Sequence, residues 1–263
     1  MDVARVAGQA VIDTYLESRQ KRLKVNLDEP DVIIRVDVIH DEIFIGIDTT
    51  GDDALHKRWY RVYKHPAPLN ASIAASLIRI ADWNENKVLL DPMAGGGTIL
   101  IEAALMGRNI ATGKNRDFAY FKIFGEVLPE EDEKEISMEL YGIEKYRKHV
   151  VGAIRNARAA GVADTIKFLQ DDATKLEGIE ADTVVTNPPY GLRIGSKRII
   201  EELYSGLLAS LQNVLNDDGV AVIITSNDEI LRKYAKTLGY IIEEEIGVKY
   251  GNLDTVVFKL HLQ

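Results

Sequence analysis

Strand-like and helix-like segments alternate from about residue 69 to the end of the chain, and this alternation restricts the fold more than any other feature. Such a pattern predicts a parallel sheet with crossover helices. The expected strands are Lys87–Asp91, Leu140–Glu144, Thr165–Leu169, Asp182–Asn187, Val220–Thr225, Tyr240–Glu245 and Thr255–Leu260. The expected helices are residues 70–82, 98–106, 145–160, 199–215 and 228–238. Because the last two strands follow each other without a helix, we expect a doubly wound α/β sheet of seven strands, mostly parallel, with one antiparallel edge strand.

The first part of the chain has a different order of predicted helices and strands. Residues 1–24 place apolar side chains at helical spacing and predict one amphipathic helix. Two β-rich runs, Val32–Val36 and Ile43–Ile47, are separated by a turn-like segment and predict a hairpin. A two-stranded unit is marginal in water without further strands, so residues 1–55 are expected to be part of a domain. We therefore divide the chain into residues 1–55, a linker of residues 56–68 and a larger domain of residues 69–263.

Composition excludes several classes of protein. The 263 residues include no cysteine, which removes disulfides, thiolate zinc sites and cysteine nucleophiles, and the five histidines show no metal-ligand spacing. The net charge of −9 argues against coating nucleic acid by bulk positive charge, so a nucleic-acid site is expected to be a local patch. No apolar run approaches the length of a membrane span, and the first residues lack a signal-peptide pattern. We expect a soluble, cytoplasmic protein without a metal.

A glycine-rich segment joins the first expected strand of the sheet to a helix, and it reads Asp91-Pro92-Met93-Ala94-Gly95-Gly96-Gly97-Thr98. Three glycines allow a tight turn and a close approach of a ligand to the backbone at the carboxyl end of the strand. No lysine precedes Thr98, so the segment does not match the phosphate-binding P-loop. A cofactor site and a turn that serves only packing both remain open.

Two carboxylates fall at the ends of the next two strands. Glu144 ends one strand, and a carboxylate there can accept both hydroxyl hydrogen bonds of a ribose. Asp172 lies just past the following strand and is expected to take an adenine amino group. A single acid at a strand end is more often simply solvated. The common register of both acids with the glycine turn favours the binding interpretation.

The sharpest motif is Asn187-Pro188-Pro189-Tyr190-Gly191, at the end of an apolar strand. Two prolines prevent both helix and ladder pairing, so the Asn187 side chain and the next carbonyl are held stiffly. Both groups are hydrogen-bond acceptors and suit an exocyclic amine with two N–H groups, and Tyr190 offers a flat face for stacking. The motif indicates a site for a planar amine.

These motifs together resemble the class I S-adenosylmethionine methyltransferases that act on amino groups, whose NPPY signature matches Asn187–Tyr190. More narrowly, the chain resembles the THUMP-containing tRNA guanine-N2 methyltransferases that modify the sixth nucleotide of the acceptor stem. Residues 1–55 are similar to the last part of a THUMP domain. The narrower resemblance also rests on Asn187–Arg193, Tyr60-Arg61, Ala67-Pro68-Leu69 and Asn115–Ala119.

The resemblance implies a Rossmann-like methyltransferase fold and S-adenosylmethionine as cofactor. It implies a catalytic corner in which the target guanine, turned out of its stem, stacks on Tyr190 while its amine is held by the Asn187 side chain and the Pro188 carbonyl. No general base is assigned, because neither group is a strong base. The predicted cofactor contacts are Asp91, Ala94, Gly95, Gly97, Thr98, Glu144, Asp172, Ala173 and Asn187.

Two basic patches are candidates for tRNA contact. The first lies in the linker, where cations alternate with aromatic residues, and its predicted contacts are Lys57, Arg58 and Arg61. The second follows the signature and comprises Arg193, Lys197 and Arg198. A linker that packs its tryptophan on the domain, and a solvated helix start, are the alternatives.

The chain departs from the resembled family in one respect. Members carry a ferredoxin-like segment and a complete THUMP domain, of which most is absent here, so the chain is expected either to be a fragment or to have a partner chain that supplies the missing part. Two other functions stay open. One is methylation of adenine N6 or of a protein glutamine, since the signature serves these as well. The other is a module that binds S-adenosylmethionine or RNA without catalysis.

Overall fold

The structure is a computed structural model that describes residues 3–51, 53–113, 116–127, 132–191 and 197–262. The chain divides into two compact units. Unit 1 comprises Met1–Leu55 and Gly113–Glu130, and unit 2 comprises His56–Thr112 and Glu131–Gln263.

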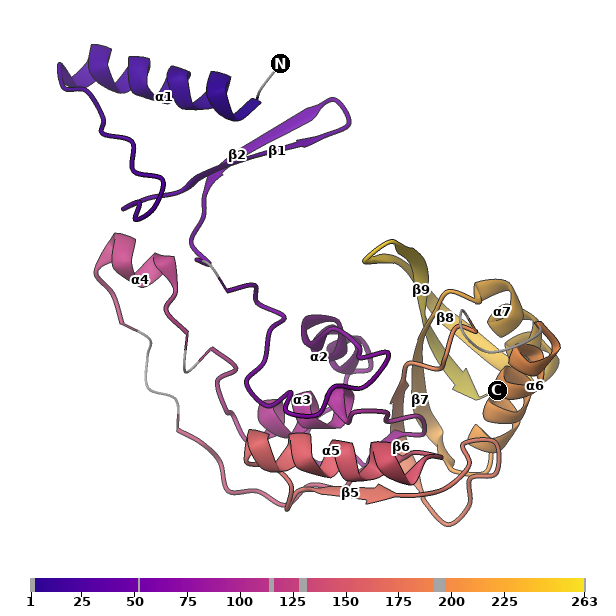
Figure 1. Cartoon of the computed structure of the whole chain (residues 1–263). Helices are drawn as coiled ribbons and strands as arrows, with labels where there is room; N and C mark the ends of the chain where they lie inside the picture. Colours follow the sequence, from indigo (N-terminus) through magenta and orange to yellow (C-terminus); the bar gives the residue numbers. More distant parts are fainter. Residues whose placement is uncertain (1–2, 52, 114–115, 128–131, 192–196, 263) are drawn as a thin grey trace. The chain divides into compact units, whose positions relative to one another are not determined.

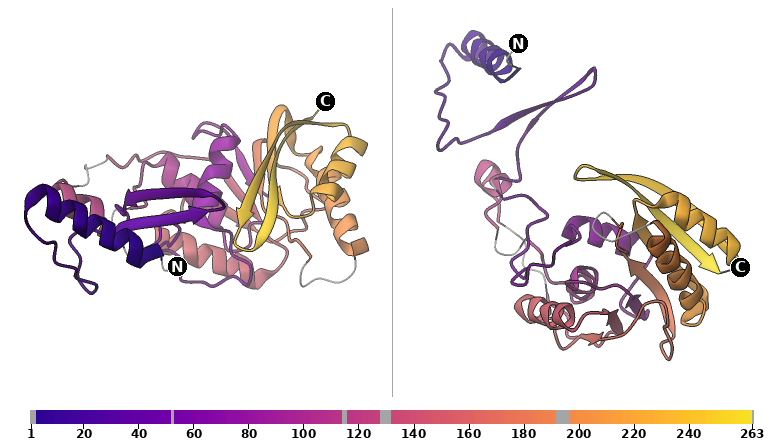
Figure 2. Two further views of the ribbon diagram at one scale, coloured as in Figure 1. Left: turned by 90° about the horizontal axis from the view of Figure 1, so that it is seen from above. Right: turned by 45° about the vertical axis from the view of Figure 1, so that its right-hand side comes forward.

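Unit 1 contains the expected helix and hairpin. Helix α1 spans Val3–Arg19 and contacts strand β1, Ile34–Ile39, which pairs antiparallel with β2, Glu42–Ile47 (Figures 1 and 2). His40 makes the turn with a φ of 57°. None of the residues in α1, β1 or β2 is buried, and in β2 the side chains of Ile43 and Ile45 are 65% and 68% exposed. The hairpin therefore presents apolar side chains that this part of the chain does not cover.

Residues 116–127, which contain Phe118, Tyr120, Phe121 and Phe124, also belong to unit 1. They include a short helix, α4, over Ala119–Phe124, which the sequence did not predict. The backbone N–H of Tyr120 donates to the carbonyl of Thr49, and the Arg116 guanidinium donates to the carbonyls of Asp53 and Ala54, each over 2.8 Å. By its contacts this segment groups with the N-terminal residues, although the sequence analysis assigned it to the larger domain.

Unit 2 is built on one seven-stranded sheet in the order β5-β4-β3-β6-β7-β9-β8. Strands β3 to β7 are parallel to one another, whereas β9 pairs antiparallel with both β7 and β8. The predicted fold class is confirmed. The antiparallel pairing lies at one edge of the sheet, where β9 runs opposite to the other strands and lies between β7 and the edge strand β8. The strand bounds are β3 Leu89–Asp91, β4 Leu140–Ile143, β5 Ile166–Leu169, β6 Ala181–Thr186, β7 Leu215–Thr225, β8 Tyr240–Tyr250 and β9 Leu253–Leu262.

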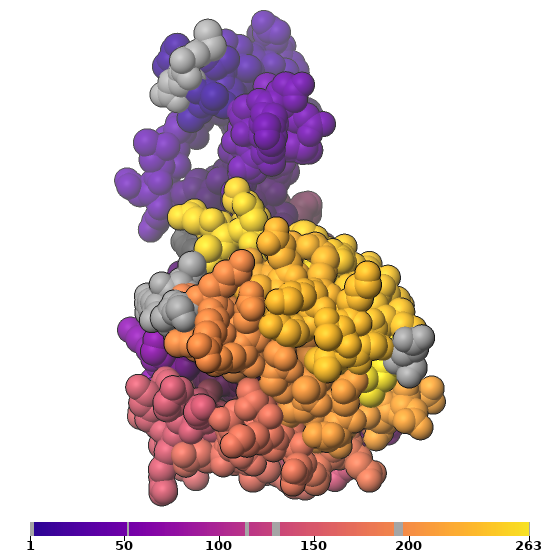
Figure 3. All heavy atoms as spheres, turned by 90° about the vertical axis from the view of Figure 1, so that its right-hand side faces the viewer, coloured from indigo at the N-terminus to yellow at the C-terminus, as the bar shows by residue number. Residues whose placement is uncertain are grey.

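Helices cover both faces of this sheet and enclose two separate cores (Figures 1 and 2). Because side chains alternate along a strand, Leu89 enters one core and Leu90 the other. The first core lies under α2 Ala71–Ile80, α3 Thr98–Gly107 and α5 Arg147–Ala160. The second lies under α6 Lys197–Leu211 and α7 Asp228–Thr237, whose outer surface forms the orange and yellow face in Figure 3.

The topology brings chemically active strand ends together. β3 is flanked by β4 on one side and β6 on the other, and all three run in the same direction. The residues that follow these strands therefore meet beyond the carboxyl ends of the strands, where open α/β sheets bind ligands. Among the described residues, no helix combines the length and the apolar character that a membrane span requires.

Candidate active site

The glycine turn after β3 is held by backbone hydrogen bonds and by close packing. The N–H of Ala94 donates to the carbonyl of Ile143 in β4 over 2.9 Å, and the N–H of Gly97 donates to the carbonyl of Ala94 over 2.7 Å. Gly95 and Gly97 have φ values of 54° and 80°, in the left-handed region that favours glycine. A Cβ on Gly97 would lie 2.9 Å from the Phe168 ring. Gly97 thus serves packing, and Thr98, buried, begins α3 directly after it.

Asp91 lies at the end of β3 with its side chain buried. Its Oδ1 accepts hydrogen bonds from the Thr186 hydroxyl at 2.9 Å and from the N–H of Met93 at 3.1 Å. Burial raises the pKa of Asp91 to about 7, while these two hydrogen bonds oppose the shift. Among the described residues the structure shows no ion pair to Asp91, so this buried carboxylate is suited to meet a cationic group of a ligand.

Glu144 follows β4 and reaches the glycine turn. Its Oε2 accepts the N–H of Gly95 at 3.2 Å, and its Oε1 accepts the N–H of Tyr146 at 2.8 Å. Each carboxylate oxygen has two acceptor positions, so each retains one for another donor. The side chain is only half-buried. Glu144 therefore retains the acceptor positions that a contact with two ribose hydroxyls requires, and the ribose contact itself stays a prediction.

Asp172 follows β5 and is ionised at neutral pH. Lys145 donates to its Oδ2 at 2.8 Å, and the N–H and hydroxyl of Thr174 donate to its Oδ1 at 3.0 and 2.8 Å. The hydrogen bond from Lys145, together with those from Thr174, lowers the pKa of Asp172 to about 2. Oδ2 keeps one acceptor position for a ligand amine, and the neighbouring Ala173 is buried.

The diproline corner leaves β6 beside these groups. The Asn187 Oδ1 atom is buried and has no hydrogen-bond partner among the described residues. Pro188 is buried, Pro189 exposed and Tyr190 half-buried. The Tyr190 hydroxyl is also buried without a partner in that part of the chain, and burial raises its pKa. Because the hydroxyl end of Tyr190 faces the interior, a stacking partner would meet the rest of the ring.

An unpartnered buried acceptor calls for a physical explanation, because such an atom costs roughly 1–3 kcal/mol of desolvation. The Asn187 Oδ1 atom needs a donor that comes from outside the described chain. An exocyclic amine with two N–H groups would provide one.

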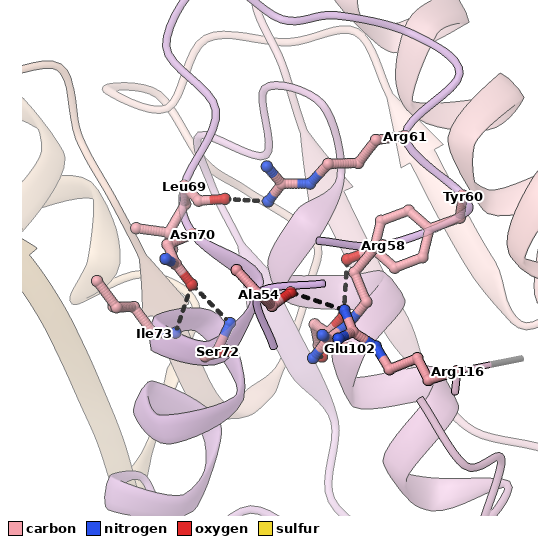
Figure 4. A network of polar contacts seen from close by, with 10 residues as sticks. All are labelled: Ala54, Arg58, Tyr60, Arg61, Leu69, Asn70, Ser72, Ile73, Glu102 and Arg116. Carbon is pink, nitrogen blue, oxygen red and sulfur yellow. Dashed lines mark hydrogen bonds and ion pairs between the residues drawn. The ribbon is translucent and has the colours of Figure 1, made fainter. Parts of the chain in front are cut away.

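The linker residues are arranged differently from the sequence prediction. Arg58 makes two hydrogen bonds of 2.9 Å to the Glu102 carboxylate on α3, and its side chain is only 6% exposed (Figure 4). Tyr60, fully buried, donates to the same carboxylate at 2.7 Å. The predicted RNA contact at Arg58 is thus replaced by a buried ion pair that fixes this segment to α3 within unit 2.

The other predicted RNA residues differ in their surroundings. Arg61 is half-buried and donates to the carbonyl of Leu69 (Figure 4). Lys57, Lys197 and Arg198 are exposed, and Arg198 pairs with Glu202 at 2.7 Å along α6. Arg193 lies outside the described residues. An RNA surface built from these predictions therefore rests on the exposed cations rather than on Arg58.

Sequence reasoning missed a cluster that packs against the glycine turn. The His65 ring lies 4.4 Å from the His149 ring, between centroids, and a Cβ on Gly95 would come within 3.3 Å of it. His149 is buried, and its Nδ1 atom is hydrogen-bonded to the Tyr63 hydroxyl at 2.7 Å. Burial, and to a lesser extent the neighbouring His65, lowers the pKa of His149. Asn156 on α5 accepts from the Tyr63 N–H and donates to the Gly96 carbonyl. Only the fold brings these positions together, so no local signal in the sequence marked them.

Two models of protein families match the chain. Residues 58–256 match the model described as RMKL-like, methyltransferase domain, and residues 1–48 match the THUMP domain. The chain is 54% identical to a tRNA (guanine(6)-N2)-methyltransferase of Archaeoglobus fulgidus, over 98% of this chain and 64% of the relative. It is 47% identical to a tRNA (guanine(6)-N2)-methyltransferase of Methanocaldococcus jannaschii, over 100% of this chain and 72% of the relative.

Solved structures agree with the fold. One is a possible methylase from Clostridium difficile 630, with a TM-score of 0.78, 31% identity, and coverage of 100% of this chain and 70% of that one. Another is SMU.472, which is complexed with SAH, with a TM-score of 0.76, 25% identity, and coverage of 98% of this chain and 69% of that one.

Proposed function

We propose a function for this chain from one premise: the chain belongs to the family of RMKL-like methyltransferase domains, and its N-terminal residues match the THUMP domain. It transfers a methyl group from S-adenosylmethionine to the exocyclic N2 amine of a guanine in tRNA. The names of the two archaeal relatives favour the guanine at position 6.

The observation that carries this proposal is the buried Asn187 Oδ1 atom, which has no hydrogen-bond partner in the part of the chain that the structure describes. Thr186, the residue before Asn187, donates to Asp91 at 2.9 Å, so the amine-accepting corner and the glycine turn are direct neighbours. A guanine N2 amine has two N–H groups and suits two acceptors, the Asn187 side chain and the Pro188 carbonyl.

The residues present fit S-adenosylmethionine, which is the methyl donor of this family. Glu144 keeps one acceptor position on each oxygen for the two ribose hydroxyls, and Asp172 keeps one for the adenine amine. The buried Asp91 suits the positively charged end of the cofactor. When bound, S-adenosylmethionine supplies an electrophilic methyl group.

The role of the protein in the transfer is alignment. Asn187 and Pro188 hold the amine so that its lone pair faces the methyl group, and the ring of Tyr190 supports the base. Flipping a base costs a few kcal/mol, and stacking on an aromatic side chain returns about 1–3 kcal/mol. Holding a weakly basic amine needs neither a metal nor a dedicated base, and the amine loses its proton to water late in the reaction.

Exposed cations are the proposed contacts to the tRNA phosphates, namely Lys57, Lys197 and Arg198, with Arg193 added from the sequence alone. With tRNA as the substrate, the proposed location of the activity is the cytoplasm.

The proposed domain division of the chain is a THUMP-like part over residues 1–55, a linker over residues 56–68 and the methyltransferase domain over residues 69–263. A further chain segment or a partner chain that completes the THUMP fold would cover the exposed apolar hairpin of unit 1.

The test is transfer of a tritiated methyl group to bulk tRNA, followed by analysis of the labelled nucleoside. The expected product is N2-methylguanosine. Label in N6-methyladenosine, or in protein, would support the other amine substrates of the signature. The Asn187→Ala variant should keep most of its affinity for S-adenosylhomocysteine, measured by titration calorimetry, because the other cofactor contacts remain, while methyl transfer falls at least about 100-fold. The exposed Asn213→Ala variant is the control, and equal activity in the Asn187 variant would remove its assigned role.

A further inference from the structure

Asn227 makes an unexpected contact with the diproline corner. It lies between β7 and α7, and its side-chain Nδ2 donates to the carbonyl oxygen of Tyr190 over 3.0 Å. Tyr190 is 37 residues away in sequence and is the last residue of the amine-binding signature. The contact therefore joins the corner to the end of the next strand in the sheet.

The position of Asn227 makes this contact notable. Asn227 is the N-cap of α7, where an asparagine side chain commonly accepts a backbone N–H of the first helical turn. Here its side chain makes no capping hydrogen bond. The amide is turned to the Tyr190 carbonyl instead, so α7 forgoes a stabilising cap while the corner gains an anchor.

A buried network fixes Asn227. Its backbone N–H donates to the Thr225 hydroxyl at 2.8 Å, and that hydroxyl is hydrogen-bonded to the Tyr204 hydroxyl at 2.6 Å. Thr225 and Tyr204 are fully buried and come from β7 and α6. The anchor thus rests on two elements that cannot move without disturbing the second core.

The corner needs such an anchor on its carboxyl side. Pro188 and Pro189 stiffen the start of the corner, but Gly191 follows with a φ of 81° and restricts the backbone little. The Tyr190 hydroxyl has no hydrogen-bond partner among the described residues. The bond from Asn227 to the Tyr190 carbonyl therefore supplies a polar contact to a residue whose hydroxyl lacks one in the described part of the chain.

We infer that Asn227 is a positioning residue for methyl transfer, which fixes the Tyr190 carbonyl and thereby keeps the acceptors at Asn187 and Pro188 aimed at the amine. The inference rests on the proposed function. It predicts that loss of the Asn227 amide lowers the rate of transfer without weakening cofactor binding, because Asn227 is not among the proposed contacts to the cofactor and acts through the Tyr190 carbonyl.

The experiment compares Asn227→Ala with the wild type and with Asn216→Ala. Asn216 is a matched control, since its Nδ2 also makes one side-chain hydrogen bond, to Asp182 at 2.8 Å, at the opposite end of β6. We expect kcat to fall about 10- to 100-fold in Asn227→Ala, with the dissociation constant for S-adenosylhomocysteine within about twofold of the wild type. Asn216→Ala should keep its kcat. An unchanged kcat in Asn227→Ala, or an equal loss in both variants, overturns the inference.

A spectroscopic readout separates this inference from the proposed function. The amide resonance of Gly191 belongs to the peptide group whose carbonyl accepts from Asn227, so it should shift in Asn227→Ala and stay in place in Asn216→Ala. An unshifted Gly191 amide overturns the inference whatever the activity. A wild-type protein that methylates no tRNA overturns the proposed function, and the Gly191 amide then decides whether the contact between Asn227 and Tyr190 exists.

A second variant covers the case in which Asn227→Ala does not fold. Tyr204→Phe removes one hydroxyl of the supporting network and should also reduce kcat. A full kcat in that variant counts against the inference.

Discussion

The Thr186 hydroxyl donates a hydrogen bond of 2.9 Å to the Asp91 carboxylate, and this bond joins the end of β6 to the end of β3. Both side chains are buried. The strands pair in parallel just before these residues, with Leu89 opposite Thr183 and Leu90 opposite Val184. The diproline corner and the glycine turn are therefore neighbours, which is the arrangement that the proposed transfer of a methyl group to an amine requires.

Glu144→Gln should weaken cofactor binding. The Glu144 carboxylate accepts two backbone N–H groups, one on each oxygen, and a glutamine presents an NH₂ group to one of these donors. The same NH₂ group replaces an oxygen assigned to one ribose hydroxyl, and the loss of that hydrogen bond, worth about 1–3 kcal/mol, should raise the dissociation constant for S-adenosylhomocysteine about tenfold or more. Titration calorimetry measures this, with the exposed Glu177→Gln as control. Equal affinity in all three proteins would remove Glu144 from the cofactor site.

Gly97→Ala and Gly161→Ala form a matched pair for stability. Both glycines have left-handed φ values, 80° and 78°, so an alanine at either position costs about 1–2 kcal/mol. A Cβ at Gly97 would also lie 2.9 Å from the Phe168 ring, whereas nothing lies within 4 Å of one at Gly161. Urea unfolding should therefore show an additional loss of about 1–3 kcal/mol for Gly97→Ala. Equal losses would show that the turn relaxes freely.

Arg58→Ala should destabilise the protein without changing its affinity for tRNA phosphates. Removal of the guanidinium takes the cation from the buried Glu102 carboxylate and leaves it the hydrogen bond from Tyr60, and breaking such a buried pair costs about 3–5 kcal/mol. Arg198→Ala is the converse control, because Arg198 is exposed: stability should stay unchanged while tRNA affinity falls. Thermal unfolding and tRNA binding at several salt concentrations measure both effects. A reduced salt dependence of binding in folded Arg58→Ala would restore the predicted RNA contact.

The buried Asp91 should make stability decrease as pH rises. In the folded chain its pKa is raised to about 7 by burial, against an ordinary value of 3.8. Between these two values the folded state holds a proton that the unfolded state has released, so the free energy of unfolding falls as pH increases through this window. Asp91→Asn retains an acceptor oxygen and should lack this component. Urea unfolding at a series of pH values measures the difference between wild type and variant.

Asp172→Asn provides a test of opposite sign. The pKa of Asp172 is lowered to about 2, mainly by Lys145, so its contribution to stability is present above 3.8 and is lost as the pH falls toward 2. The contribution should be small because the Lys145 side chain is 63% exposed and the Asp172 side chain 31% exposed, so that solvent screens the pair. A pH profile in which both variants differ from wild type with the same sign would contradict the assigned protonation states.

Local patterns predicted the sheet and its covering helices because each element has a strong apolar period, and each predicted strand of unit 2 appears. The bounds of β8 and β9 were too short: the hairpin continues to Tyr250 and Leu253 with mixed polar residues that carry little apolar signal. Helix α4 was missed because six residues are too few for a helical period to show.

The site was predictable where one segment supplies the geometry, as in the glycine turn and the diproline corner. It was not predictable where distant elements meet. Arg58 looked like a free cation because its partner, Glu102, lies 44 residues away in an apolar helix. Asn227 and the His65–His149 pair carry no local pattern, and only the three-dimensional arrangement shows what they contact.

The alternation of Leu89 and Leu90 between the two cores has a consequence for evolution and engineering. Insertion or deletion of one residue within β3 or β6 would exchange the faces of every side chain beyond that point and turn the terminal carboxylate or amide toward a helix layer. We therefore expect the number of residues in these two strands to be fixed, in addition to the apolar character of their buried positions.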